Sequence, residues 1–250
     1  MIREFRIRDG SVTHVGAVRK ENEDSQFSAR QARVWLVADG MGGHSDGRFA
    51  SQTIVDAVGA MQLPEDIDLA LDGIASAIHG ANSAIFTRAQ SLGAQIGSTV
   101  VALVVRGNEF VVLWAGDSRA YLLRDGALIQ LTRDHTQVEL MVERGLLSPE
   151  EAADHPMKHV LARAVGVEET LEIDAIKDQI AARDLFLLCS DGLYGVLSDA
   201  EIAAYLTEFG HEAGEHMVAA VLERGAPDNV TVTLIAASEP TLLMPAGSQP

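Results

Sequence analysis

Acidic residues beside glycine, asparagine or a second acid recur at four places, each close to an apolar run that resembles a strand. These places are Glu23-Asp24, Asp39-Gly40, Asp191-Gly192 and Asp228-Asn229. Carboxylates that the fold brings together need a positive partner, and hard oxygen ligands select Mg²⁺, Mn²⁺ or Ca²⁺. Two such ions about 4 Å apart can activate a water for in-line attack on phosphorus. The pattern predicts a divalent-metal site for phosphoester hydrolysis; the alternative is a set of independent turn residues.

Asp39 lies at the centre of this pattern. The apolar residues 34–38 predict a strand buried on both faces, which delivers Asp39 into the glycine-rich turn 40–43. Glycine lets that turn bend and approach a ligand closely. A strand, a glycine turn and a helix also fit a dinucleotide-binding motif, but Ser45 occupies the position of its third glycine. We therefore prefer the metal site.

Cys189 is the only cysteine, so an intrachain disulfide is impossible and a reducing compartment is suitable. A cysteine phosphatase would need an arginine six residues after its nucleophile, where this chain has Gly195. Cys189 also continues the apolar run 185–188, which favours a place in the core.

The composition favours a single catalytic domain over residues 1–237, followed by a disordered tail at 238–250, since 47% of the 250 residues are hydrophobic. The formal charge of −17 disfavours nucleic acid or an anionic membrane as partner. The N-terminus lacks the apolar core of a signal peptide, and no apolar run reaches the roughly 18 residues of a spanning helix. We expect a cytoplasmic monomer with no membrane span.

Alternating and helical periodicities place the secondary structure that must position the acids. Strands are expected at 11–18, 25–29, 34–38, 98–105, 109–115, 119–123, 127–131, 171–176, 184–190 and 230–237, and helices at 50–61, 71–85, 136–144, from 198 onward and at 212–224. Tight turns such as Asp125-Gly126 connect consecutive strands and favour antiparallel pairing. The expected fold class is α+β: two packed antiparallel β-sheets, a central β-sandwich, flanked by α-helices on both faces. A small helical insertion at 133–170, the flap segment, interrupts the strands.

Six short motifs in order across residues 12–237 resemble those of the metal-dependent protein serine/threonine phosphatases of the protein phosphatase 2C type, in their bacterial form. The motifs are residues 19–25 (RKENEDS), 38–44 (ADGMGGH), 97–99 (GST), 116–119 (GDSR), 190–192 (SDG) and 228–231 (DNVT). Each motif alone is weak, whereas six in order are specific. The resemblance implies a phosphatase that hydrolyses phosphoserine and phosphothreonine on proteins through a water bridging two divalent metals.

The resemblance also implies which residues hold the two ions, Mn²⁺ or Mg²⁺. Asp39 would bridge both, and Gly40 would contribute its backbone carbonyl. Asp191 and Asp228 would hold the first ion. Glu23 would hold the second ion through water.

Other roles follow from the same resemblance. Asp24 would orient the waters, and Arg19 would bind the substrate phosphate, a task that suits the fork of a guanidinium. Asp117 would join Asp191 around a weaker third ion. The flap segment corresponds to the family's mobile flap.

The donor of the proton to the leaving group stays open. Met41 stands where animal relatives carry a histidine that is proposed as the general acid, and His44 is a nearby alternative. The implied partners are phosphorylated proteins, including a serine/threonine kinase and its substrates. The alternative function is a phosphoprotein-binding pseudophosphatase or regulatory scaffold of the same fold, against which the intact acids argue.

Overall fold

The structure is a computed structural model that describes residues 5–43, 45–153 and 155–239. Two of the sequence-based predictions concern residues outside these ranges. They are the possible proton donor His44 and all but the first two residues of the expected tail at 238–250.

Two antiparallel sheets form the centre of the fold, as expected. The first has the strand order β1-β11-β10-β7-β8, and the second has the order β2-β3-β5-β6-β9, with β4 pairing β3. The strands of the first sheet are β1 (Arg6–His14), β7 (Arg119–Arg124), β8 (Ala127–Gln130), β10 (Leu185–Cys189) and β11 (Val230–Ser238). Those of the second are β2 (Asp24–Ala29), β3 (Val34–Met41), β4 (Gly97–Ser98), β5 (Val100–Arg106), β6 (Glu109–Ala115) and β9 (Asp174–Gln179).

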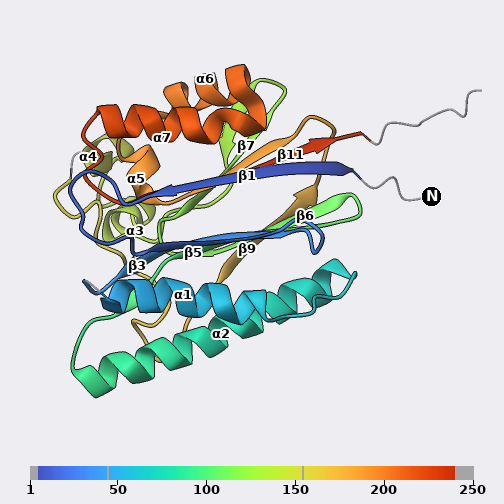
Figure 1. The fold of residues 1–250 in the computed structure, drawn as a ribbon. Coiled ribbons are helices and arrows are strands. Elements are labelled where there is room, and N and C mark those ends of the chain that lie inside the picture. Colours follow the sequence, from blue (N-terminus) through green and yellow to red (C-terminus); the bar gives the residue numbers. More distant parts are fainter. Residues whose placement is uncertain (1–4, 44, 154, 240–250) are drawn as a thin grey trace, which may run out of the picture.

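Helices cover both outer faces of this sandwich (Figure 1). Helices α1 (Ser45–Gly59) and α2 (Ile67–Leu92) lie on the second sheet, and α6 (Asp199–Phe209) and α7 (Ala213–Glu223) lie on the first. Three short helices lie at one end of the sandwich, α3 (Gln137–Glu143), α4 (Pro149–Ala153) and α5 (Asp191–Tyr194), and a 3₁₀ turn, η1 (Gly210–Glu212), precedes α7. Within the described ranges, no helix combines the length and apolarity needed to cross a membrane.

The apolar run of β3 shows why the sandwich forms. Val34, Leu36 and Ala38 pack into the core beneath α1 and α2, whereas Trp35 and Val37 pack into the core between the two sheets. A strand with apolar neighbours on both faces gains from burying consecutive side chains, so its sequence is uniformly apolar rather than alternating. The run therefore places Asp39 at the end of a central, fully packed strand.

The helix boundaries follow local capping signals. Ser198 and Glu201 form the expected capping box at the start of α6. Ser148 and Glu151 exchange the corresponding hydrogen bonds at the start of α4. Thr136 caps α3 by accepting from the Glu139 N–H.

The strand boundaries at two edges differ from those expected. The strand expected at 171–176 is β9, Asp174–Gln179; Leu171 and Ile173, which suggested the earlier start, precede the strand and pack against the core beneath α1 and α2. The strand expected at 11–18 is β1, Arg6–His14. Both are edge strands, which carry too few apolar side chains for periodicity to fix their ends.

Candidate metal centre

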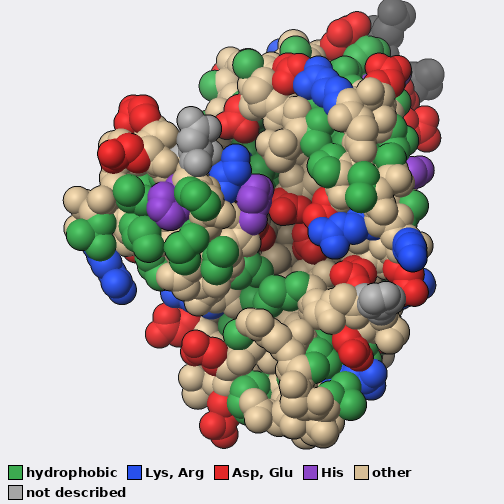
Figure 2. Space-filling model, turned by 90° about the vertical axis from the view of Figure 1, so that its left-hand side faces the viewer, with side chains coloured by type: hydrophobic (Ala, Val, Ile, Leu, Met, Phe, Trp, Pro, Cys, Tyr) green, Lys and Arg blue, Asp and Glu red, His purple; other side chains and the backbone are tan. Residues whose placement is uncertain are grey.

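A cavity of about 320 Å³ opens at the end of the sandwich where α3, α4 and α5 lie. Figure 2 looks onto this end and shows acidic side chains gathered in a hollow with basic side chains at its rim. Five acidic side chains and one guanidinium line the cavity: Glu23, Asp39, Asp117, Asp191, Asp228 and Arg19. The Gly40 backbone lines it as well. Of the residues predicted for the site that the structure describes, Asp24 alone does not line the cavity.

Asp39 is held by its backbone. Its N–H donates to Thr99 Oγ1 (3.0 Å), and its carbonyl oxygen accepts from the Thr99 N–H (2.8 Å) and from Ser98 Oγ (2.9 Å). These hydrogen bonds fix the backbone of Asp39, and none of them involves its carboxylate. This clamp gives the motif at 97–99 a physical role that spacing alone did not show.

Gly40 and Gly47 pack closely against Glu23 and fix its position. A Cβ on Gly40 would lie 2.1 Å from the Gly47 carbonyl oxygen and 2.7 Å from the Glu23 carbonyl oxygen. A Cβ on Gly47 would lie 2.7 Å from Cδ of Glu23. The first turn of α1 thus packs directly against the Glu23 carboxylate, where the positive end of the helix dipole favours it. Sequence reasoning missed Gly47, whose only signal is a glycine in the first turn of a helix.

The Asn229 side chain, just before β11, forms hydrogen bonds with the loop that contains Arg19 and Glu23. Its side-chain oxygen accepts from the Glu23 N–H (2.8 Å), and its side-chain nitrogen donates to the carbonyl oxygens of Val15 (2.8 Å) and Glu21 (3.0 Å). The Arg19 guanidinium donates to Asp228 Oδ2 at 2.7 Å, from the rim of the cavity. Asn229 therefore acts as a positioning residue for both charged groups.

Asp24 lies behind the cavity, between the two sheets. Its Oδ2 accepts from Ser190 Oγ (2.8 Å) and Thr231 Oγ1 (2.7 Å). Its Oδ1 is the one buried side-chain oxygen or nitrogen of the described residues without a hydrogen-bond partner. Burial raises the pKa of Asp24 to about 7, against the opposing effect of the two hydroxyl bonds. An unsatisfied buried carboxylate oxygen calls for an ordered water or ion beside it.

The carboxylates of the cavity destabilise one another's charge. Burial, and then repulsion from Asp191, raises the pKa of Asp117 to about 7. Burial, followed by repulsion from Asp24 and Asp191, holds the pKa of Asp39 well above its usual range. Burial and repulsion from Asp228 raise the pKa of Asp191. Clustered carboxyl groups with raised pKa values mark a site whose missing partner is positive charge.

This donor set fits a divalent cation. All the acidic donors are hard carboxylate oxygens, the preference of Mg²⁺ and Mn²⁺. Within the ranges described above, no three acidic, histidine or cysteine side chains are already gathered around a single point. Asp228 is paired with Arg19 in this arrangement.

We expect the metal-free protein to lose thermal stability as the pH rises from about 4 to about 7. The pKa values of Asp24 and Asp117 are raised to about 7 in the fold, above the usual value of 3.8, so the native state binds more protons than the unfolded chain in this interval. Saturating Mn²⁺ should reverse the loss, because it binds the ionised native cluster. Calorimetric melting with EDTA or Mn²⁺ at pH 5 and pH 8 tests this, and a Mn²⁺ effect equal at both pH values would contradict it.

The comparisons with known proteins agree with this geometry. The chain matches the protein phosphatase 2C family over residues 15–226. It is 38% identical over 223 residues to the serine/threonine protein phosphatase PstP of Mycobacterium tuberculosis, a match that covers 88% of this chain and 43% of PstP. The chain thus spans less than half the length of that relative.

Two further similarities extend over nearly the whole of the protein or domain compared. The chain is 34% identical over 238 residues to the serine/threonine phosphatase Stp of Listeria innocua, which covers 89% of this chain and 93% of Stp. A crystal structure of the PstP catalytic domain in complex with two manganese ions matches with a TM-score of 0.82 and 34% identity, covering 93% of this chain and 99% of that domain. From the ordered motifs, the acidic cavity and these matches, we conclude that the chain belongs to the protein phosphatase 2C family.

Proposed function

We propose that this protein is a metal-dependent phosphatase that hydrolyses phosphoserine and phosphothreonine esters on proteins. The observation that carries the proposal is the cavity in which five acidic side chains from separate parts of the sequence face one guanidinium. The names of PstP and Stp, both serine/threonine phosphatases, support the same substrate class.

Five residues are proposed to hold the metal ions. Asp39 and the Gly40 carbonyl would hold two divalent ions, Mn²⁺ or Mg²⁺, together with Asp191, Asp228 and Glu23. When bound, the ions supply the positive charge that activates a water and stabilises the phosphoryl group. The use of manganese is supported by the PstP domain with two manganese ions.

Three further residues complete the proposed site. Arg19 presents a two-pronged donor to the phosphate from the rim. Asp24 orients water from behind the cavity through its unpaired oxygen. Asp117 lies on the cavity wall where it could share a third, weaker ion with Asp191.

The rival function is phosphoprotein binding without catalysis. A pseudophosphatase of this fold would have lost its metal ligands, whereas every acidic position is retained here. The purified protein should hydrolyse p-nitrophenyl phosphate and a phosphothreonine peptide with Mn²⁺, and should stop when EDTA is added. Binding of the phosphopeptide without Mn²⁺-dependent turnover of either compound would favour the scaffold.

We further propose that the protein acts in the cytoplasm as a monomer, on a serine/threonine kinase and the substrates of that kinase. Two observations support this. The single cysteine is buried and free, which suits a reducing compartment. All the acidic residues proposed to hold the ions come from one chain, so the cavity needs no second copy.

A further inference from the structure

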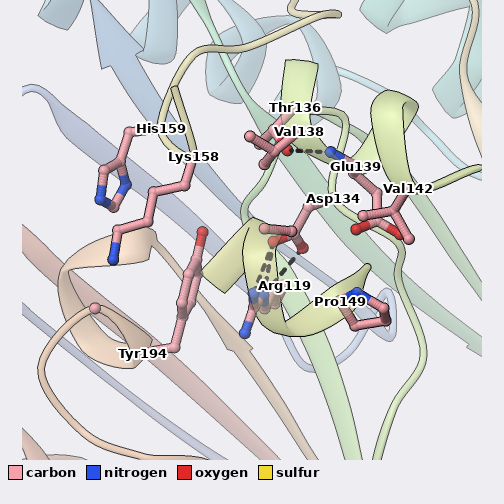
Figure 3. Close-up of a pocket in the computed structure, with 12 residues that line it drawn as sticks. Arg119, Asp134, Thr136, Val138, Glu139, Val142, Pro149, Lys158, His159 and Tyr194 are labelled. Carbon is pink, nitrogen blue, oxygen red and sulfur yellow. Dashed lines mark hydrogen bonds and ion pairs between the residues drawn. The ribbon is translucent and has the colours of Figure 1, made fainter. Parts of the chain in front are cut away.

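The metal cavity adjoins a larger cavity of about 490 Å³ between the flap segment and the core. We call this larger cavity the flap pocket. Figure 3 shows it, with Val142 and Pro149 on one side and Tyr194, Lys158 and His159 on the other. His159 lines both cavities, and its Nδ1 lies 4.0 Å from Asp191 Oδ2. A peptide whose phosphorylated residue lies over the acidic cluster can therefore reach the flap pocket past His159.

The metal cavity adjoins a further cavity as well. A third cavity, of about 460 Å³, shares Met41, Gly42 and Leu161 with the metal cavity. The segment 158–162 contributes to all three cavities. Three cavities that adjoin through shared residues suit an extended segment of polypeptide rather than a small phosphoester.

The charged groups that line the flap pocket largely neutralise one another. Arg119 donates three hydrogen bonds of 2.7 to 3.1 Å to the Asp134 carboxylate. Its guanidinium also stacks over the Tyr194 ring, 3.6 Å from the ring centre. Across the whole lining, the positive Arg119 and Lys158 are balanced by the negative Asp134 and Glu139. A charged occupant would lose hydration without meeting a net opposite charge.

One wall of the pocket is apolar, although Thr136 and His159 also line the cavity. Val138 and Val142 of α3 face the pocket, as do Pro149 and Ala152 of α4, and the Tyr194 ring closes the core side. An apolar side chain placed there would be removed from water against these groups, which is the dominant favourable term in such contacts.

We propose that the flap pocket binds an apolar side chain of the substrate protein, close in sequence to the phosphorylated residue. This inference rests on the proposed function and names the residues that the enzyme prefers around its target. An extended peptide advances about 3.3 Å per residue, so an occupant that shares His159 with the phosphorylated residue lies within about three positions of it. The contact selects substrates and does not take part in the hydrolysis.

The first experiment measures kcat/KM with Mn²⁺ for phosphothreonine peptides in a glycine and alanine background. Leucine, aspartate or lysine is placed in turn at each of three positions on either side of the phosphothreonine. Leucine should exceed aspartate and lysine by about tenfold or more at one or two neighbouring positions, mainly through KM. Equal values at all positions would overturn the proposal.

The second experiment changes the pocket itself. Val142→Trp fills it and should abolish the leucine preference, while the turnover of p-nitrophenyl phosphate and the melting temperature stay near those of the unmodified protein. Leu146→Trp is the matched control, since this flap residue is 68% exposed and lies outside the pocket lining. Val142→Arg adds a cation to the same wall and should move the preference from leucine toward aspartate.

The possible outcomes distinguish a failure of the flap-pocket proposal from a failure of the proposed phosphatase function. A leucine preference that persists in both Val142 variants, or that Leu146→Trp reduces equally, would overturn the role of the flap pocket alone. Absence of Mn²⁺-dependent turnover of p-nitrophenyl phosphate by the unmodified protein would overturn the proposed function, and the role of the pocket with it.

Discussion

Replacing Asp39 with asparagine is expected to lower metal-dependent turnover by about 100- to 1,000-fold, the range seen when a group that acts on a developing charge is removed. Asparagine keeps the shape of the side chain and removes the charge that is proposed to bridge both ions. The backbone of this residue is clamped by Thr99 and Ser98, so the strand end should keep its place. Turnover of p-nitrophenyl phosphate measures the loss of activity, and calorimetric titration with Mn²⁺ measures the loss of metal affinity.

The melting temperature distinguishes the loss of a metal ligand from damage to the fold. The metal-free Asp39→Asn protein should melt at the same temperature as the unmodified protein or higher at pH 8, because one repelling carboxylate has gone. Its melting temperature should then respond little to Mn²⁺. Asp125→Asn makes the same change in an exposed hairpin turn and serves as the control. Near-normal turnover with normal Mn²⁺ dependence in Asp39→Asn would refute the bridging role.

Replacing Arg19 with alanine is expected to lower kcat/KM for a phosphothreonine peptide by about 10- to 100-fold, which corresponds to roughly 1.5 to 3 kcal/mol for a charge-assisted hydrogen bond. The inhibition constant of inorganic phosphate should rise in parallel. Arg19→Lys should recover part of the loss, because the ammonium keeps the charge but not the fork.

The pairing of Arg19 with Asp228 makes this test more informative. Arg19 is 52% exposed, so its ion pair adds little to stability and the melting temperature should hardly change. Mn²⁺ should bind Arg19→Ala at least as tightly, since Asp228 no longer shares its charge with a guanidinium. Arg30→Ala removes another exposed arginine that pairs with an aspartate, Asp9, and is the matched control. Unaltered kinetics in Arg19→Ala would remove Arg19 from phosphate binding.

Much of the fold can be predicted from the sequence because its signals are local. The uniform apolar run at 34–38 predicts a strand with a core on each face, and β3 has both. The turn at Asp125-Gly126 predicts the hairpin of β7 and β8. Serine and glutamate three residues apart predict the start of α6. In each case the deciding residues are within a few positions of one another.

The membership of the candidate site could also be predicted, since each acid stands beside a glycine, an asparagine or a second acid at the end of an apolar run. That these acids meet in and behind one cavity depends on the pairing of distant strands. Asp24 lies opposite Asp39 in the β2 and β3 ladder, and Ser190 and Thr231 reach Asp24 from the other sheet. The sequence identifies the acidic residues, but only the register of the paired strands shows that they lie close together.

By itself, the sequence determined most of the elements, the order of the motifs and the acidic chemistry of the site, because propensity, periodicity and charge are properties of neighbouring residues. Only the tertiary structure decided the contacts across the site. The packing of Gly47 on Glu23, the three backbone bonds of Asn229 and the place of His159 between two cavities each join residues that are far apart in the chain. Such contacts depend on how the two sheets and the flap segment pack, and no local pattern encodes that packing.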